Sequence, residues 1–147
     1  MIHLRPCARE ELGVLDDMDR QEHARQFVIQ TGLEVHQQQF DHPGVTYLVI
    51  ENDEGECCGY FILVLEADGR SVEFRRILVD EHRRGIGQSA IVEMENYCRR
   101  EYEAGRIWLD VFEDNQLGIH IYEKLGYERF SADSHEGRRL FLYEKDL

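Results

Sequence analysis

A short segment with two arginines and two glycines carries the strongest chemical signal in this sequence. It reads His82-Arg83-Arg84-Gly85-Ile86-Gly87 and lies between an apolar stretch typical of a strand and a longer stretch with helical apolar spacing. A helix N-terminus offers unpaired backbone N–H groups and a partial positive charge, and glycines let a phosphate approach the backbone closely. The segment therefore predicts a site for the pyrophosphate of a nucleotide-containing cofactor.

The glycine pattern alone does not identify the nucleotide. Residues 85–90 also fit the dinucleotide fingerprint G-x-G-x-x-G/A, and Asp110 lies about twenty residues further on, as that fingerprint expects. However, the fingerprint belongs to a first strand-helix-strand unit, whereas three strands of a meander precede it here. The chain from Ile91 to Leu147 is also too short for a second nucleotide-binding half. A P-loop is excluded because no Gly-Lys-Ser/Thr occurs.

The elements that must position this turn can be read from apolar periodicity and turn residues. The predicted strands are 2–5, 45–51, 59–66, 72–79, 106–112, 127–131 and 139–144. The predicted helices are 8–18, one or two within 20–40, 86–104, and a short helix that Asn115 starts and Gly126 ends. A meander followed by strand-helix-strand predicts an α/β fold of the α+β type. Its mixed, mostly antiparallel sheet has a central parallel pair and flanking helices.

Composition limits the function classes. The 147 residues fit one domain, 1–147, with enough hydrophobic residues for a core. The absence of a signal sequence or a long apolar run predicts a cytoplasmic protein outside the membrane. A net charge of −13 argues against nucleic-acid binding and favours a cationic substrate. The four cysteines form no CxxC pair, and the scattered histidines predict no metal site.

From Val45 onward the chain resembles the GCN5-related N-acetyltransferase (GNAT) family. Residues 73–79 resemble the family's fourth strand, and the arginine–glycine turn resembles its acetyl-CoA pyrophosphate loop, Q/R-x-x-G-x-G/A. Asn115 resembles the family's asparagine, and residues 122–127 (Tyr-Glu-Lys-Leu-Gly-Tyr) resemble its Y-x-k-x-G-F/Y element. His82 stands where the family usually has Gln or Arg, which puts His82 itself in doubt as a ligand.

The resemblance implies a place for each part of acetyl-CoA. Family members splay strands four and five apart, so that the pantetheine arm pairs with strand four; here this involves Ile77, Leu78 and Val79. The pyrophosphate is expected on Arg84, Gly85, Ile86, Gly87 and Gln88, with Arg83 adding charge. Asn115 is expected to contact the pantetheine or the adenosine side.

The resemblance also implies the proton transfers. Tyr122, about two helical turns after Asn115 and hence on the same face, is expected to protonate the coenzyme A thiolate. Glu73 is the candidate general base, with Glu113 and Asp110 as weaker alternatives. Regular strand alternation predicts that Glu73 shares a face with Arg75, Ile77 and Val79. The other interpretation of Glu73 is an ion pair with a neighbouring arginine.

The leading hypothesis is therefore an N-acetyltransferase that moves an acetyl group from acetyl-CoA to a primary amine. The acceptor, a cationic small molecule or a protein amine, is expected to contact residues 20–40 and the strand ends. One alternative is a non-catalytic acyl-CoA-binding regulatory domain; another, disfavoured by chain length, is a dinucleotide-dependent oxidoreductase domain. Dimers are common in the family, so a homodimer is plausible.

Overall fold

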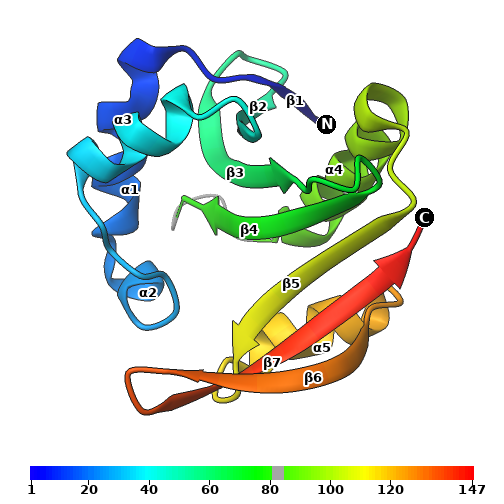
Figure 1. Ribbon diagram of the computed structural model, residues 1–147. Helices are drawn as coiled ribbons and strands as arrows, with labels where there is room; N and C mark the ends of the chain where they lie inside the picture. The colour runs from blue at the N-terminus through cyan, green and yellow to red at the C-terminus, as the bar shows by residue number, and fades with distance from the viewer. Residues whose placement is uncertain (81–84) are drawn as a thin grey trace.

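The fold is centred on a seven-stranded twisted sheet, which Figure 1 shows in a computed structural model that describes residues 1–80 and 85–147. The strand order is β1-β2-β3-β4-β5-β7-β6, and only β4 and β5 of the described strands run parallel as neighbours. The strands are β1 (Ile2–Pro6), β2 (Val45–Asn52), β3 (Cys57–Leu65), β4 (Ser71–Val79), β5 (Arg106–Phe112), β6 (Glu128–His135) and β7 (Arg138–Asp146). The predicted fold class is confirmed.

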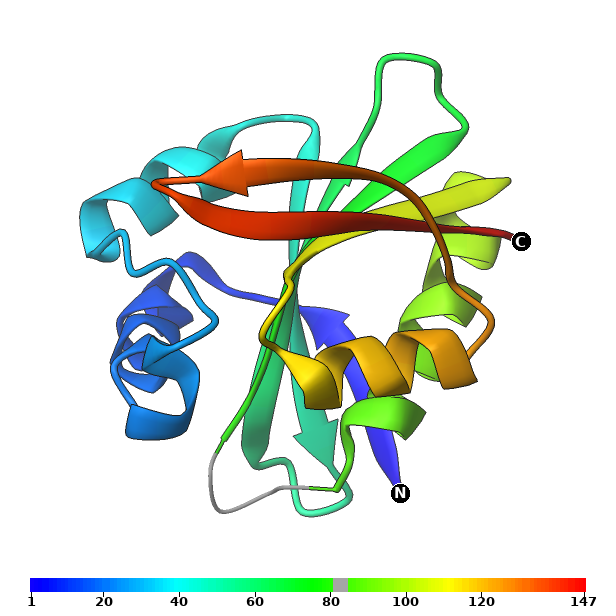
Figure 2. The same cartoon turned by 90° about the horizontal axis from the view of Figure 1, so that it is seen from below.

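The helices cover the two faces of the sheet in separate groups. They are η1 (Arg9–Glu11), α1 (Leu12–Asp19), α2 (Glu22–Arg25), α3 (Leu33–Asp41), α4 (Gly87–Tyr102) and α5 (Gln116–Lys124). Figure 2 shows α1, α2 and α3 on one side and α4 and α5 on the other. The predicted helix 8–18 is a 3-10 turn followed by α1, and the region 20–40 holds two separate helices.

Each face of the sheet has its own hydrophobic core. Beneath α4 and α5, residues such as Ile91 and Met94 pack on Phe61, Phe74 and Ile107. On the opposite face, Leu12 and Leu15 of α1 pack on strand residues such as Val49 and Tyr60. Successive strand side chains point to opposite faces, so strands with both faces covered become apolar on both sides. This explains the long apolar runs of β2 and β3.

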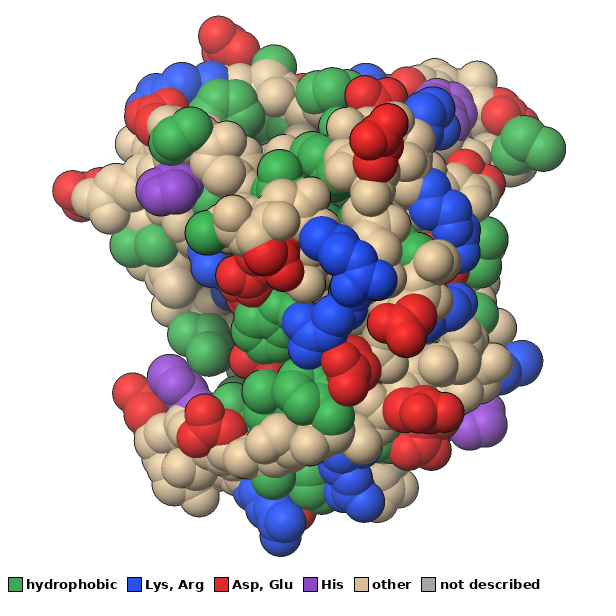
Figure 3. Space-filling view, turned by 45° about the vertical axis from the view of Figure 1, so that its right-hand side comes forward, with side chains coloured by type: hydrophobic (Ala, Val, Ile, Leu, Met, Phe, Trp, Pro, Cys, Tyr) green, Lys and Arg blue, Asp and Glu red, His purple; other side chains and the backbone are tan. Residues whose placement is uncertain are grey.

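The outer surface is strongly charged. The chain has 17 basic and 30 acidic residues, and on the face in Figure 3 acidic and basic side chains are interspersed with exposed hydrophobic ones. Within residues 1–80 and 85–147, no helix combines the length and apolarity needed to cross a bilayer.

Candidate active site

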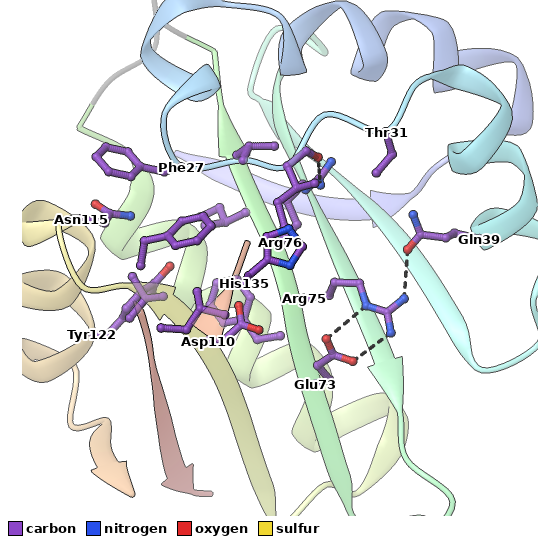
Figure 4. Close-up of a pocket in the computed structure, with 17 residues that line it drawn as sticks. Phe27, Thr31, Gln39, Glu73, Arg75, Arg76, Asp110, Asn115, Tyr122 and His135 are labelled. Carbon is purple, nitrogen blue, oxygen red and sulfur yellow. Dashed lines mark hydrogen bonds and ion pairs between the residues drawn. The ribbon is translucent and has the colours of Figure 1, made fainter. Parts of the chain in front are cut away.

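A cleft opens where the two parallel strands separate. β4 and β5 pair at Ser71–Arg106, Val72–Ile107 and Glu73–Trp108, and the ladder ends there. Beyond this point lies a cavity of about 430 Å³. Its walls come from β4, β5, α5 and the segment before α3, which contributes residues 27–29 and Thr31. Figure 4 shows side chains from both strands pointing into this gap. The splayed central pair that the resemblance implied is therefore present.

Tyr122 lines the cleft from α5. Its side chain is 9% exposed, and its ring packs edge-on against Phe74 and Tyr127 at centroid distances of 5.9 and 6.0 Å. Burial, and then the negative charge of Asp110, raise the pKa of the Tyr122 phenol above its ordinary value. The phenol therefore keeps its proton at neutral pH and can donate it.

Asn115 lies on the same cleft as Tyr122, as their spacing of seven residues predicts. Its side-chain oxygen accepts a hydrogen bond from the Gly118 N–H at 3.0 Å and caps the start of α5. Thus Asn115 fixes where the helix that carries Tyr122 begins.

Glu73 lies in the cleft beside an arginine. Its two carboxylate oxygens accept hydrogen bonds from Arg75 at 3.0 and 3.1 Å, and Arg75 also donates to Gln39 of α3 at 3.0 Å. Figure 4 shows these three side chains joined in a row. The structure thus contains the ion pair that was the alternative interpretation of Glu73.

A β-bulge changes the face on which the residues after Glu73 point. Phe74 pairs with Leu63 and Arg76 with Ile62, so Arg75 is an extra residue in β4. After the bulge, Ile77 packs in the same core as Phe74, whereas Leu78 packs against the α1 side. The prediction that Glu73 shares a face with Ile77 and Val79 is therefore wrong, because the inserted residue reverses the alternation.

Asp110 projects into the cleft from β5, two residues beyond the last pair with β4. Partial desolvation by the surrounding cleft atoms raises the pKa of its carboxyl, and the negative charge of Glu73 raises it further, while the residue itself stays exposed to solvent. In Figure 4 its carboxylate lies in the gap between Tyr122 and Glu73. The sequence analysis had ranked Asp110 only as a weaker alternative base.

The start of α4 suits a phosphate group. Its N-cap residue Ile86 makes no side-chain capping hydrogen bond, so the N–H groups of the first turn are left for a ligand or solvent. Gly85 has φ +99°, which favours glycine, and a Cβ added at Gly85 or Gly87 would meet no atom within 4 Å. Protein packing therefore does not explain Gly87, whereas close approach of a ligand would. The predicted ligands Arg83 and Arg84, and His82, lie outside the described residues.

Part of the strand that was predicted to pair with pantetheine already makes contacts within the protein. Ile77 lines the cleft, but the Leu78 side chain is buried against α1. The Val79 carbonyl accepts a hydrogen bond from Nε2 of His23 on α2 at 2.7 Å. His23 was not predicted from the sequence, since nothing in the local pattern links α2 to the end of β4.

A buried polar network, which no local sequence pattern predicts, anchors the cleft wall. Asp19 accepts hydrogen bonds from Arg76 at 3.1 Å and from Tyr60, and lies 2.7 Å from Nε2 of His36. Arg76 also donates to the Ile29 carbonyl at 2.6 Å, in the segment that lines the cleft. Arg76 thus ties α1 and this segment to β4.

The same network contains three potential metal ligands. Asp16, Asp19 and His36 are all buried, and their ligand atoms lie within 4.8 Å of one another. The guanidinium groups of Arg20 and Arg76 already neutralise the two carboxylates. The arrangement is therefore that of a structural ion-pair network.

Comparison with known proteins decides the family. The sequence matches the acetyltransferase (GNAT) family over residues 12–127. The chain belongs to the acetyltransferase (GNAT) family. Membership confirms the resemblance and the predicted class of enzyme, an acetyltransferase that uses acetyl-CoA.

Solved structures of other GNAT acetyltransferases share this fold. The spermidine N-acetyltransferase of Vibrio cholerae, solved with CoA and spermine, superposes with a TM-score of 0.84 at 16% identity, covering 99% of this chain and 95% of that one. The aminoglycoside acetyltransferase AAC(6')-Ib, solved with coenzyme A and kanamycin, gives 0.83 at 18% identity, with coverage of 99% and 95%. No curated protein sequence matches closely enough to count as a relative. At these identities the likeness establishes the fold alone.

Proposed function

We propose that this GNAT protein transfers the acetyl group of acetyl-CoA to a primary amine that enters the cleft between β4 and β5. The observation that carries the proposal is the position of Tyr122, a protonated phenol on the wall of a cleft that opens where the parallel strands part. Acetyl transfer needs a proton for the departing thiolate, and Tyr122 can supply it.

The residues around the cleft suit acetyl-CoA. The edge of β4 at Ile77, which lines the cleft, suits an extended arm, and the start of α4 at Gly87, whose N-cap residue makes no side-chain capping hydrogen bond, suits a pyrophosphate. Gly85, Ile86 and Gln88 would complete the phosphate site, with Arg83 and Arg84 adding charge, and Asn115 would contact the arm. When bound, acetyl-CoA supplies the activated thioester.

The amine must also lose a proton. Glu73, the predicted base, and Asp110 both present carboxylates to the cleft. Either group accepts a proton from an amine that attacks the thioester carbonyl, directly or through water.

The acceptor proposed for this cleft is a cationic amine. Glu73, Asp110, Arg75 and Arg76 line the cavity. Arg75 pairs with Glu73 and Arg76 with Asp19, which leaves Asp110 as the carboxylate of the lining without an ion-pair partner among the described residues. Negative groups attract a protonated amine and raise its local concentration. The two superposed acetyltransferases were solved with spermine and with kanamycin, both of which are polyamines. A cleft of about 430 Å³ suits a small-molecule amine.

The experiment is release of free thiol from acetyl-CoA by the purified protein with a panel of amines. The panel holds spermidine, kanamycin, an amino acid and a lysine peptide, with separate binding of acetyl-CoA and NAD measured by calorimetry. We expect acetyl-CoA binding, no NAD binding, and thiol release that depends on a cationic amine. Acetyl-CoA binding without thiol release for any amine would instead support the non-catalytic regulatory alternative.

A further inference from the structure

We propose that Asp110, and not Glu73, is the catalytic base that takes the proton from the acceptor amine. The inference rests on the proposed function and assigns one residue of the same site. It depends on what each carboxylate contacts and on where each lies relative to Tyr122.

The Glu73 carboxylate already makes hydrogen bonds within the protein. Both of its oxygens are held by Arg75, whose guanidinium is itself fixed by Gln39. These two charge-assisted hydrogen bonds hold both oxygens against the guanidinium, so an incoming amine would have to compete with Arg75 for them. The pair also directs the Glu73 oxygens toward α3 and away from β5, as Figure 4 shows.

Asp110 has no such partner among the described residues. Its neighbours Leu109 and Val111 belong to the core beneath α4 and α5, so Asp110 points to the opposite face, as Glu73 does. There it lines the cleft, and its charge acts directly on the phenol of Tyr122. Asp110 and the proposed acid therefore border the same cleft, in which the reacting amine and thioester would meet.

The charges that face Asp110 come from three elements. Glu73 and Arg75 lie on β4, Asp133 and His135 on β6, and Tyr122 on α5. The negative charges of Glu73 and Asp133 oppose ionisation of Asp110, and Arg75 and His135 favour it. Partial desolvation has the largest effect and raises the pKa of Asp110 above its ordinary value, although the side chain keeps contact with solvent. A raised pKa makes a carboxylate a stronger base near neutral pH.

Residues of the cleft can take up and supply the protons that the transfer requires. The attacking nitrogen of the acceptor first loses its ammonium proton to solvent. The neutral amine then forms a carbon–nitrogen bond to the acetyl carbon, and the carbon–sulfur bond breaks. Asp110 accepts the proton that the amine nitrogen loses, and Tyr122 donates one proton to the departing sulfur. Tyr122 then regains its proton from Asp110 through water, which restores both groups. The products are the N-acetyl amine and free coenzyme A.

The test compares the pH profiles of kcat/KM for Asp110→Asn and Glu73→Gln with that of the wild type, using the best amine of the panel. We expect Asp110→Asn to lower kcat/KM by about 10²-fold or more at pH 7 and to lose the acidic limb of the profile. Glu73→Gln should keep that limb and lose less than tenfold. Asp110→Glu retains a carboxylate and should keep the limb at a reduced kcat. Asp53→Asn, on the exposed hairpin at residues 52–55, is the control and should match the wild type.

The outcomes separate the two proposals. If the wild type releases no thiol with any amine, the proposed function fails, and the role of Asp110 fails with it. If the wild type is active but Asp110→Asn keeps the acidic limb, or Glu73→Gln loses it, only the assignment of Asp110 is wrong. Binding of acetyl-CoA to each variant, measured by calorimetry, shows that the site has kept its structure.

Discussion

Glu73 pairs with Trp108 at the last rung of the parallel ladder between β4 and β5, and Glu73 is also the first residue of β4 that lines the cleft. This pair marks the boundary between the part of the sheet that is stabilised by backbone hydrogen bonds and the part left open for a ligand. Asp110, two residues further along β5, is consequently among the first side chains of that strand to face the cleft. Both carboxylates are thus placed by where the pairing stops.

Tyr122→Phe tests the proposed acid. The change removes one hydroxyl from a ring that packs between Phe74 and Tyr127, so the fold should be unaffected. We expect kcat to fall by about 10²-fold, because the thiolate leaves without a proton donor, while the Kd for acetyl-CoA stays within about twofold. Steady-state kinetics and calorimetry measure these quantities. Tyr97→Phe on α4, outside the cleft, is the matched control; equal activity of the two variants would exclude Tyr122 from proton transfer.

Gly87→Ala separates stability from cofactor binding. A Cβ at this position meets no protein atom within 4 Å, and alanine is favoured over glycine in a helix, so the free energy of unfolding should rise by about 0.5–1 kcal/mol. The same methyl group would obstruct a phosphate at the start of α4. We expect the Kd for acetyl-CoA to rise about tenfold, or about 1.4 kcal/mol.

The control for this change is Gly13→Ala near the start of α1, where an added Cβ also meets nothing within 4 Å. It should stabilise the protein without changing acetyl-CoA affinity. Unchanged affinity in Gly87→Ala as well would argue against a phosphate at this helix end. Urea unfolding and calorimetry give both quantities.

Arg76→Met tests the buried network behind the cleft. The substitution keeps much of the side-chain volume but leaves the buried Asp19 carboxylate without its guanidinium partner. We expect the free energy of unfolding to fall by about 3 kcal/mol, measured by urea denaturation. KM for the amine should rise too, because the Ile29 carbonyl loses its donor. Arg9→Met breaks an exposed ion pair with Asp41 and should leave the free energy of unfolding almost unchanged. A similar loss in both variants would contradict a special role for the network.

Acid stability should depend on Glu11. The Arg5 guanidinium lowers the pKa of this carboxyl from 4.5 to about 2. Because the folded-state pKa is depressed, the stabilisation is fully present above pH 4.5 and is lost as the pH falls toward 2. The pair is partly exposed to solvent, so we expect only about 1 kcal/mol. Urea unfolding at pH 6 and pH 2.5 should show a smaller pH-dependent loss for Glu11→Gln than for the wild type, and equal losses would contradict the assignment.

The sheet was largely predictable because its strands are long, apolar and bounded by polar or glycine-containing turns. β5 was placed with the observed bounds, Arg106–Phe112. The bulge at Arg75 was not predictable, since it depends on how β4 pairs with Ile62 and Leu63 of another strand. Period-two alternation along one strand contains no information about such an insertion.

Only those parts of the candidate site whose residues lie close together in the sequence were predictable. Tyr122 and Asn115 lie on one short helix, and their spacing alone placed them together. The network of Asp19, His36 and Arg76 joins three elements far apart in sequence, so no local pattern reveals it. The ion pair between Glu73 and Arg75 depends on how the side chains are arranged. From the sequence alone, this ion pair and a role as general base were both possible for Glu73.

The early end of the β4–β5 ladder has a consequence for how the molecule responds to temperature. Within the described chain, three residue pairs join the two strands, while the core beneath α4 and α5 spans both parts of the sheet through residues such as Phe61 and Ile107. Few backbone hydrogen bonds therefore join the two strands, and apolar contact has a larger part in holding them together. Since hydrophobic stabilisation weakens on cooling, lowering the temperature should loosen the contact between the two parts of the sheet.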